Sequence, residues 1–252
     1  DEVIGFAEGL GQEVFTGSTG RVFPTRMKAS PLLRAWLARL DALGVVLLRR
    51  HRWVGPLTPH TQHLFETPKG KVPLTAGALI LALGGASWAR LGSDGAWQRV
   101  VAAAGVPIVP IQASNVGMRR AWSAHMKPFF GQPVKNVELT VAGQRSRGEF
   151  VITQSGVEGG AIYALGRMLR QTPLAQIDFA PQLSLQVLRA MISNRKPKDS
   201  LGNFLRKSVK LDATKRALLF ELTRPMRRDT EGLVAAIKAA PLTLAGSRPI
   251  DE

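Results

Sequence analysis

The chain has 252 residues, 45% of them hydrophobic, which is enough for one large domain or two smaller ones with a substantial core. It contains no cysteine, which excludes disulfides, thiolate nucleophiles and cysteine metal sites, and we expect a cytoplasmic protein. No apolar run approaches the roughly 20 residues of a membrane-spanning helix, so no membrane partner is expected. The net charge of +16 leaves nucleic-acid binding open, but the scattered basic residues and single tyrosine favour an ordinary solvated surface.

The first hundred residues alternate between helical and strand patterns. Residues 30–44 give the clearest helix, with Ser30 as N-cap, Pro31 in the first turn and Gly44 after the last turn. Further elements are expected as strands at 45–48, 52–54, 62–67 and 79–83 and as a helix at 97–104. This alternation predicts a layered α/β domain over residues 1–107.

The apolar run at 79–83 predicts a strand buried on both faces, of the kind found in parallel sheets. It ends in Gly84 and Gly85, and glycines at the end of such a strand let the main chain approach a ligand closely. The pattern indicates a nucleotide-type cofactor. Asp94, in the glycine-flanked segment that follows, could accept a hydrogen bond from a sugar hydroxyl or cap the next helix, and the capping role is favoured.

The pattern changes after residue 106. The proline-rich segment 106–110 is expected to cross between domains, and 134–141 and 147–153 predict an antiparallel pair around a turn. Helices are expected at 159–170, 183–192, 201–207, 213–222 and 230–239. A last strand at 242–245 is expected to return to the first domain. The division is therefore 1–107, an inserted domain of a small antiparallel sheet plus helices at 108–240, and a return at 241–252.

Few residues qualify for acid–base or metal chemistry. Four histidines are present, and His60 and His63 lie three apart in a proline-bounded loop without a third ligand, so no metal site is expected. The sequence holds no Gly-x-Ser-x-Gly elbow, no phosphate-binding Gly-x-x-x-x-Gly-Lys-Ser/Thr loop and no Gly-x-Gly-x-x-Gly. These absences leave the catalytic residues unassigned.

A second candidate ligand segment is 11–24, which combines glycines and hydroxyl side chains. Arg21 offers a planar fork suited to anions, and Lys28 stands just before the long helix. A ligand site and an ordinary surface turn are both compatible with this pattern. Arg21 and Lys28 are the residues that we would assign to charge tuning or to binding an anionic substrate.

Several of these segments together resemble one family. The similarity is carried by residues 17–24, 27–30, 32–37, 81–88, 92–95, 153–162, 242–246 and 250–252. In this order they are similar to the BaiN-type (YhiN-type) flavoproteins. The chain departs from the family's Thr-His-x-Gly-x-Ser-Gly-Pro-Ala stretch, because Gln154 replaces the histidine, Glu158 the serine and Gly160 the proline.

The resemblance implies a bacterial NAD(P)/FAD-dependent oxidoreductase with a partial Rossmann-like FAD domain and an inserted domain. It also implies a central portion of a longer protein, lacking the family's glycine-rich segments at both ends. Residues expected near FAD are Gly20, Arg21, Val22, Gly84, Gly85, Ala86, Ser87, Gly92 and Asp94. NAD(P)H is the expected reductant and a small molecule the expected substrate. A basic nucleic-acid-binding module and a flavoprotein-like scaffold without catalysis are the alternatives.

Overall fold

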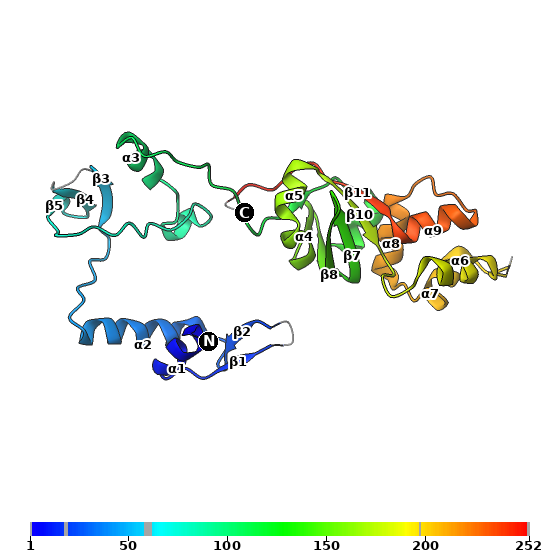
Figure 1. The fold of residues 1–252 in the computed structure, drawn as a ribbon, viewed down its shortest axis with the longest axis horizontal. Coiled ribbons are helices and arrows are strands. Elements are labelled where there is room, and N and C mark those ends of the chain that lie inside the picture. Colours follow the sequence, from blue (N-terminus) through cyan, green and yellow to red (C-terminus); the bar gives the residue numbers. More distant parts are fainter. Residues whose placement is uncertain (1, 18–19, 58–61, 197, 251–252) are drawn as a thin grey trace. The chain divides into compact units, whose positions relative to one another are not determined.

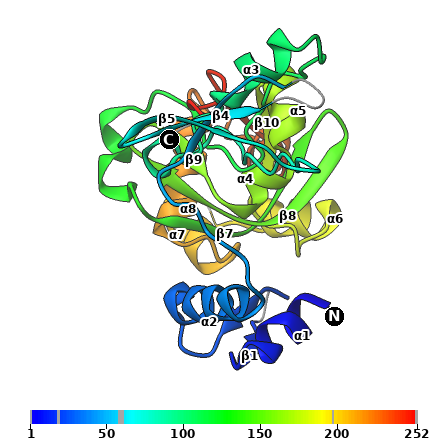
Figure 2. The ribbon, with the colours of Figure 1, turned by 90° about the vertical axis from the view of Figure 1, so that its left-hand side faces the viewer.

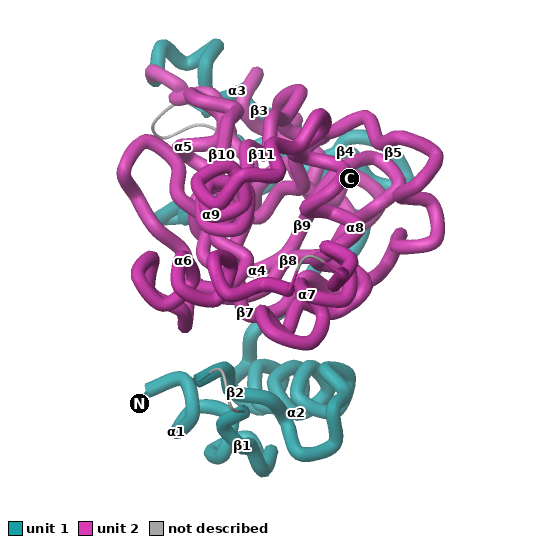
Figure 3. Tube along the Cα trace, turned by 90° about the vertical axis from the view of Figure 1, so that its right-hand side faces the viewer, with its two compact units in different colours: residues 1–80, 100–106 teal, residues 81–99, 107–252 magenta. Residues whose placement is uncertain are grey.

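The computed structural model describes residues 2–17, 20–57, 62–196 and 198–250. The chain forms two compact units (Figure 3). The first unit comprises residues 1–80 and 100–106, and the second comprises residues 81–99 and 107–252. None of the helices in the described ranges combines the length and apolar character needed to cross a bilayer.

The first unit begins with two helices and a hairpin. Helix α1 (Glu2–Gly9) and helix α2 (Ala29–Ala42) lie side by side (Figures 1 and 2), with the rings of Phe6 and Trp36 in edge-to-face contact at 6.0 Å. Between them, β1 (Val14–Thr16) pairs with β2 (Val22–Pro24).

The helix predicted at 30–44 is confirmed, but its predicted N-cap is wrong. The N-cap is Lys28, whose extended backbone precedes the helix without a side-chain cap, and Ser30 lies inside the first turn. The C-terminal end follows the prediction, because Gly44 has φ +75°, the left-handed conformation that glycine adopts at low cost.

A three-stranded antiparallel sheet follows in the same unit, in the order β3-β4-β5. Its strands are β3 (Arg52–Gly55), β4 (His63–Thr67) and β5 (Gly70–Leu74). The first two confirm the strands predicted at 52–54 and 62–67. Phe65 sits opposite Trp53 on one side and Val72 on the other, so the middle strand aligns apolar side chains across the sheet.

Two predicted strands are wrong. Residues 45–48 and 79–83 have no regular structure, and their side chains are exposed apart from half-buried Leu83, by 79% for Val46 and 89% for Ile80. The physical reason is that a strand buried on both faces needs neighbouring strands and covering helices. Every strand pair in the described ranges is antiparallel, and none of them includes these two runs.

The second unit is built around a curled six-stranded sheet, in the order β11-β10-β7-β8-β9-β6, with antiparallel pairing throughout. Its strands are β6 (Met118–Arg119), β7 (Pro133–Val141), β8 (Gln144–Thr153), β9 (Gly156–Glu158), β10 (Leu174–Asp178) and β11 (Ala240–Thr243). The predicted hairpin is confirmed as β7–β8. Ala142 and Gly143 in its turn have φ +46° and +81°, the positive angles of a two-residue type I′ turn.

The helices from residue 89 onward belong to the second unit, except that residues 100–103 of α3 lie in the first unit. They are η1 (Ala89–Leu91), α3 (Trp97–Ala103), η2 (Ala124–Phe129), α4 (Gly160–Ala164), α5 (Gly166–Gln171), α6 (Leu185–Ser193), α7 (Leu201–Lys207), α8 (Ala213–Leu222) and α9 (Thr230–Lys238). The predicted helices are confirmed, except that 159–170 divides into α4 and α5. Ser184, Ser200, Asp212 and Asp229 cap α6 to α9, each accepting a hydrogen bond from the backbone N–H three residues on.

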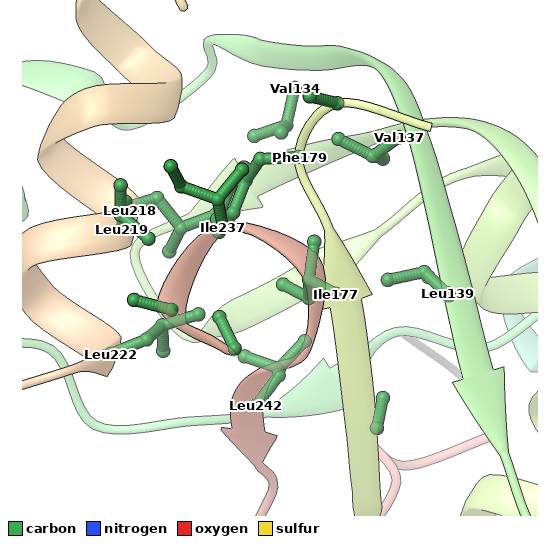
Figure 4. Close-up of a cluster of buried hydrophobic side chains, with 14 of the residues drawn as sticks. Val134, Val137, Leu139, Ile177, Phe179, Leu218, Leu219, Leu222, Ile237 and Leu242 are labelled. Carbon is green, nitrogen blue, oxygen red and sulfur yellow. The ribbon is translucent and has the colours of Figure 1, made fainter. Parts of the chain in front are cut away.

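The core of the second unit lies between its sheet and its helices. Leu139 of β7, Ile177 of β10 and Leu242 of β11 are fully buried, and Leu218 of α8 and Ile237 of α9 pack into the same cluster (Figure 4). Alternate residues of β7 point into this cluster, as the period of a half-buried strand requires.

The predicted last strand forms, but its predicted placement is wrong. It spans Ala240–Thr243 as β11 and pairs with β10 at the edge of the six-stranded sheet, not with a strand of the first unit. The reason is its alternation: Ala240 and Leu242 are buried in the core of the second unit, while Pro241 and Thr243 face outward. After Thr243 the chain continues along β6 of the same sheet, where the N–H of Ala245 donates to the carbonyl of Arg119 and Ser247 forms an antiparallel bridge with Met118.

Candidate functional site

The Gly84–Gly95 segment folds into a closed loop within the second unit. Trp88 and Ser93 form an antiparallel bridge, with both backbone N–H···O=C distances at 3.1 Å, and η1 spans the residues between them. The indole N–H of Trp97, in the first turn of α3, donates to the carbonyl of Gly84 at 3.2 Å. The diglycine is therefore held against the start of the helix that follows it.

The glycines of this loop have different roles. Gly84 has φ +71°, and Gly95 has φ +67° with a position for a Cβ only 2.8 Å from Cβ of Ala86, so both are needed for the loop itself. Gly85 has no positive φ, and a Cβ built on it would meet nothing closer than the Ser93 hydroxyl at 4.0 Å. The fold therefore does not require glycine at this position, and there is open space beside the Gly85 peptide.

Asp94 caps the following helix, which is the role that the sequence favoured. Its Oδ1 accepts a hydrogen bond from the N–H of Ala96 at 3.0 Å, directly before α3. The carboxylate thus holds a backbone donor at the start of the helix, as a capping residue does.

A cavity of about 370 Å³ opens beside the diglycine. Gly85, Ala86 and Ser87 form one wall of it. The remaining lining residues come from the segment 111–117, from Glu158 and Tyr163, and from the C-terminal residues 248–250. Segments far apart in the sequence thus meet here, and the polar groups that they offer include the side chains of Ser87, Asn115 and Tyr163.

Another part of the cavity lining carries an ion pair. The guanidinium Nη1 of Arg248 lies 3.3 Å from Oε2 of Glu158, with Glu158 at the end of β9. The backbone N–H of Arg248 also donates to the carbonyl of Gly117 at 2.9 Å. Gly117 has no space for a side chain, since a Cβ there would lie 2.9 Å from Cδ of Arg248. This pair therefore fixes the C-terminal wall while contributing no net charge.

The wall formed by 111–117 is anchored by Arg170 of α5. Its Nη1 donates to the carbonyl of Ala113 at 2.8 Å, and its Nη2 donates to Oε1 of Gln112 at 3.2 Å. A planar guanidinium that binds two points of an irregular segment holds its path without secondary structure. The segment predicted to cross between domains at 106–110 leads directly into it and is itself without helix or strand.

The 153–162 segment turns sharply beside this cavity. Gly156 has φ +150°, and a Cβ there would lie 2.0 Å from the carbonyl oxygen of Met118, so only glycine permits β9 to pair with β6. Of the three departures from the family pattern, Glu158 lines the cavity, Gln154 lies in the turn between β8 and β9, and Gly160 begins α4. Of the three positions, Glu158 is therefore the one whose side chain lines the cavity.

The segment that follows β11 is held beside β6 by the backbone of Arg119 and the side chain of Arg120. The N–H of Ala245 donates to the carbonyl of Arg119 at 2.7 Å, and Nη1 of Arg120 donates to the carbonyl of Thr243 at 2.5 Å. Arg120 also stacks over Trp122, with 5.0 Å from its guanidinium carbon to the ring centroid. Burial lowers the pKa of Arg120, against the opposing effect of the Glu221 carboxylate.

The candidates of the first unit lie in its hairpin. Gly20, Arg21 and Val22 are exposed at the turn and the start of β2, where the N–H of Gly17 donates to the carbonyl of Arg21 at 2.7 Å. Residues 18 and 19 of the predicted loop lie outside the described residues. Lys28 is exposed at the N-cap of α2. The side chain of Arg21 makes no hydrogen bond to a side chain of the described residues.

The histidines form no catalytic or metal constellation in the described ranges. His63 is buried, with its Nδ1 3.3 Å from the carbonyl of Pro56. The Nδ1 of His51 lies 2.9 Å from the carbonyl of Arg49. His125 is exposed in η2, and His60 lies outside the described residues. No group of three His, Asp or Glu side chains placed to hold a metal ion occurs among the described residues.

The sequence located the diglycine wall of the cavity but not the others. Arg170, Tyr163, Asn115 and Arg248 were not singled out, because each is an isolated polar residue in the sequence and gathers with the rest only through the sheet. A weak signal existed for one of them: Tyr163 is the single tyrosine of the chain.

The described part of the chain is mixed α/β, and a glycine loop lines one of its cavities. The comparison with protein families gives the particular family. Residues 1–243 match the HI0933-like protein Rossmann domain, and the chain belongs to this family. The family indicates a FAD-binding flavoprotein and, in general terms, an oxidoreductase. No curated protein was found to match the chain.

Proposed function

We propose that this chain is part of a BaiN-type flavoprotein that binds FAD and oxidises or reduces a small molecule, with NAD(P)H as the reductant. The observation that carries the proposal is the open space beside Gly85, at the wall of a cavity, in a chain of a Rossmann family. FAD supplies the hydride and electron chemistry when bound, and the protein's part is to bind and orient it.

The residues around the cavity suit part of a flavin dinucleotide. Its volume of about 370 Å³ lies near the lower end of the range for small-molecule sites, ~300–1,000 Å³, so it can take one portion of the cofactor. A peptide without a side chain at Gly85 allows close approach, and the Ser87 hydroxyl and the Asn115 amide offer donors and acceptors to sugar or ring atoms. The Glu158–Arg248 pair adds no net charge.

The other candidates extend this proposal to the first unit. Gly20, Arg21 and Val22 are proposed to line the flavin side, and Gly92 to allow the turn that precedes Asp94. Arg21 and Lys28 are proposed to tune charge near the flavin or to bind an anionic substrate, supported by their exposure and positive charge. The proposed domains are a partial FAD-binding domain at 1–107, an inserted domain at 108–240 and a return segment at 241–252, although β11 at the start of that segment pairs with β10. We place the protein in the bacterial cytoplasm.

The test uses the protein expressed from its complete coding sequence. It should purify yellow, with the visible absorbance of bound flavin, and a colourless protein without extractable flavin would refute the proposal. Gly85→Ala should keep the fold, since the added methyl has room, but should reduce FAD retention because the methyl occupies the open space. Gly77→Ala is the matched control, because a Cβ at Gly77 meets nothing within 4 Å, Gly77 like Gly85 has no positive φ, and it lies outside the cavity lining.

Catalysis is tested separately from binding. Anaerobic addition of NADH or NADPH should bleach the flavin absorbance of an active oxidoreductase, and the faster of the two identifies the reductant. Retained FAD that neither nucleotide reduces would favour the scaffold without catalysis, a possibility supported by the departures at Gln154, Glu158 and Gly160.

A further inference from the structure

A second cavity, of about 530 Å³, lies in the helical part of the second unit, away from the diglycine. It is formed where the α6–α7 connection and the α8–α9 connection meet, at the end of the unit that holds α6 to α9 (Figure 1). We call it the basic cavity; its lining residues are Arg195, Lys198, Asp199, Ser200, Leu201, Phe220, Arg228 and Leu233. It shares no lining residue with the cavity at Gly85.

Three cations line this cavity and only one acid. Arg195 is held in place, because its Nη1 donates to the backbone carbonyl of Asp199 at 2.8 Å. Lys198 and Arg228 are exposed, and within the described ranges neither of them makes a hydrogen bond or an ion pair through its side chain. Asp229, the acid next to Arg228 in the sequence, pairs instead with Arg227, with Nε of Arg227 3.0 Å from Oδ2 of Asp229. The cavity therefore keeps a net positive charge.

The floor of the basic cavity is apolar. Leu233 of α9 is 2% exposed, and the partly buried side chains of Phe220 and Leu201 pack against the hydrophobic core. An aromatic ring and two leucines beneath a rim of cations are suited to a ligand with a flat or apolar body and an anionic group. Free phosphate would use the rim and leave the floor exposed to water, so the arrangement favours a larger anion.

We infer that the basic cavity binds an organic phosphate of nucleotide size, with the phosphate at Lys198 and Arg228 and the flat ring over Phe220. The volume is sufficient for one mononucleotide, since sites for small organic ligands span ~300–1,000 Å³. A free nucleotide is favoured over a nucleic-acid strand, because a strand needs a continuous stacking surface and this chain has a single tyrosine, which lies at the other cavity. The inference does not depend on the proposed flavin chemistry.

The experiment is calorimetric titration of the full chain with AMP, adenosine, inorganic phosphate and a short single-stranded oligonucleotide, each at two salt concentrations. AMP should bind, with affinity falling as salt rises, and adenosine and inorganic phosphate should each bind at least about tenfold more weakly. Lys198→Gln and Arg228→Gln should each weaken AMP binding by about tenfold, the equivalent of one charge-assisted hydrogen bond. Phe220→Leu should weaken AMP binding but leave phosphate binding unchanged.

Two variants separate this site from other binding. Arg167→Gln removes an exposed cation from α5, away from the basic cavity, and should leave AMP binding as in the wild type. Gly85→Ala should also leave AMP binding unchanged. This variant is needed because FAD contains an AMP moiety, so AMP could bind at the diglycine cavity, and in that case Gly85→Ala would weaken AMP binding. AMP binding that is indifferent to Lys198→Gln and Arg228→Gln, equal affinity for phosphate and AMP, or at least tenfold tighter binding of the oligonucleotide would each overturn the inference.

Discussion

The buried amine of Lys215 offers the sharpest test of how the second unit is held together. Lys215, in the first turn of α8, is 6% exposed, and its Nζ donates to the carbonyls of Asn136 at 3.0 Å and Phe179 at 3.1 Å. These two carbonyls belong to β7 and to the residue after β10, so one side chain joins a helix to two strands. Lys215→Met keeps the apolar length of the side chain and removes both hydrogen bonds.

The magnitude follows from these two bonds. A hydrogen bond from a charged donor contributes about 1.5–3 kcal/mol, and a buried carbonyl left without a donor costs about 1–3 kcal/mol. Removing the buried charge relieves part of its desolvation cost, so the net loss in the free energy of unfolding should be about 2–4 kcal/mol. Urea unfolding measures it, and hydrogen exchange at the amides of β7 and β10 assigns it to this sheet. The control is Lys135→Met, because Lys135 is an exposed lysine on β7, the strand that contains Asn136. This substitution should cost less than about 0.5 kcal/mol.

The same residue predicts a pH dependence. Burial lowers the pKa of Lys215 below its ordinary value of 10.5, against the opposing charges of Asp212 and Asp178. Between the folded and the unfolded pKa the unfolded chain binds more protons, so stability rises with pH through the window just below 10.5. Lys215→Met should abolish this rise. If the variant unfolds at the wild-type urea concentration and keeps the same pH slope, the helix and strands are not joined in this way.

Three further changes test the fold and its charges. Leu139→Ala removes a fully buried side chain from the centre of β7 and should cost about 2–5 kcal/mol in urea unfolding, where a loss below 1 kcal/mol would contradict the packing described. Gly156→Ala places a methyl 2.0 Å from the Met118 carbonyl and should expose the amides of β6 and β9 to hydrogen exchange; unchanged protection would contradict the close approach. Burial raises the pKa of Glu221, but hydrogen bonds from Ser123 and the charge of Arg120 outweigh it and hold the pKa below 4.5. The stabilisation that the ionised Glu221 contributes is therefore present above pH 4.5 and lost as the pH falls through the lowered pKa. Glu221→Gln should reduce the fall in the free energy of unfolding at acid pH. An unchanged fall would mean that other carboxylates cause it.

Elements with a local signal were predictable from the sequence. The β7–β8 hairpin follows from alternating apolar residues on either side of Ala142-Gly143, and α7 and α8 begin and end where their capping residues and apolar spacing place them. The loop at Gly84–Gly95 was also identifiable, because glycines at positive φ leave a compositional mark. Such elements are decided by contacts between residues close in the chain.

What the sequence misjudged depended on distant partners. An apolar run such as 79–83 predicts burial but does not say what buries it, and in this structure its side chains are exposed. Likewise 242–245 predicted a strand, and the sheet that it joins was decided by the pairing of Leu242 with Ala175 of β10.

The sequence by itself thus determined α2, α3 and α6 to α9 and the turn of the β7–β8 hairpin, because short-range sterics and capping fix these, whereas it did not predict α1 or β10. Only the tertiary structure decided that Gly85, Asn115, Glu158 and Arg248 share one cavity, and that Lys198, Phe220 and Arg228 share another. The physical reason is that both cavities arise where segments separated by tens of residues are brought together by the sheet and its helices. No periodicity in the sequence records those distances.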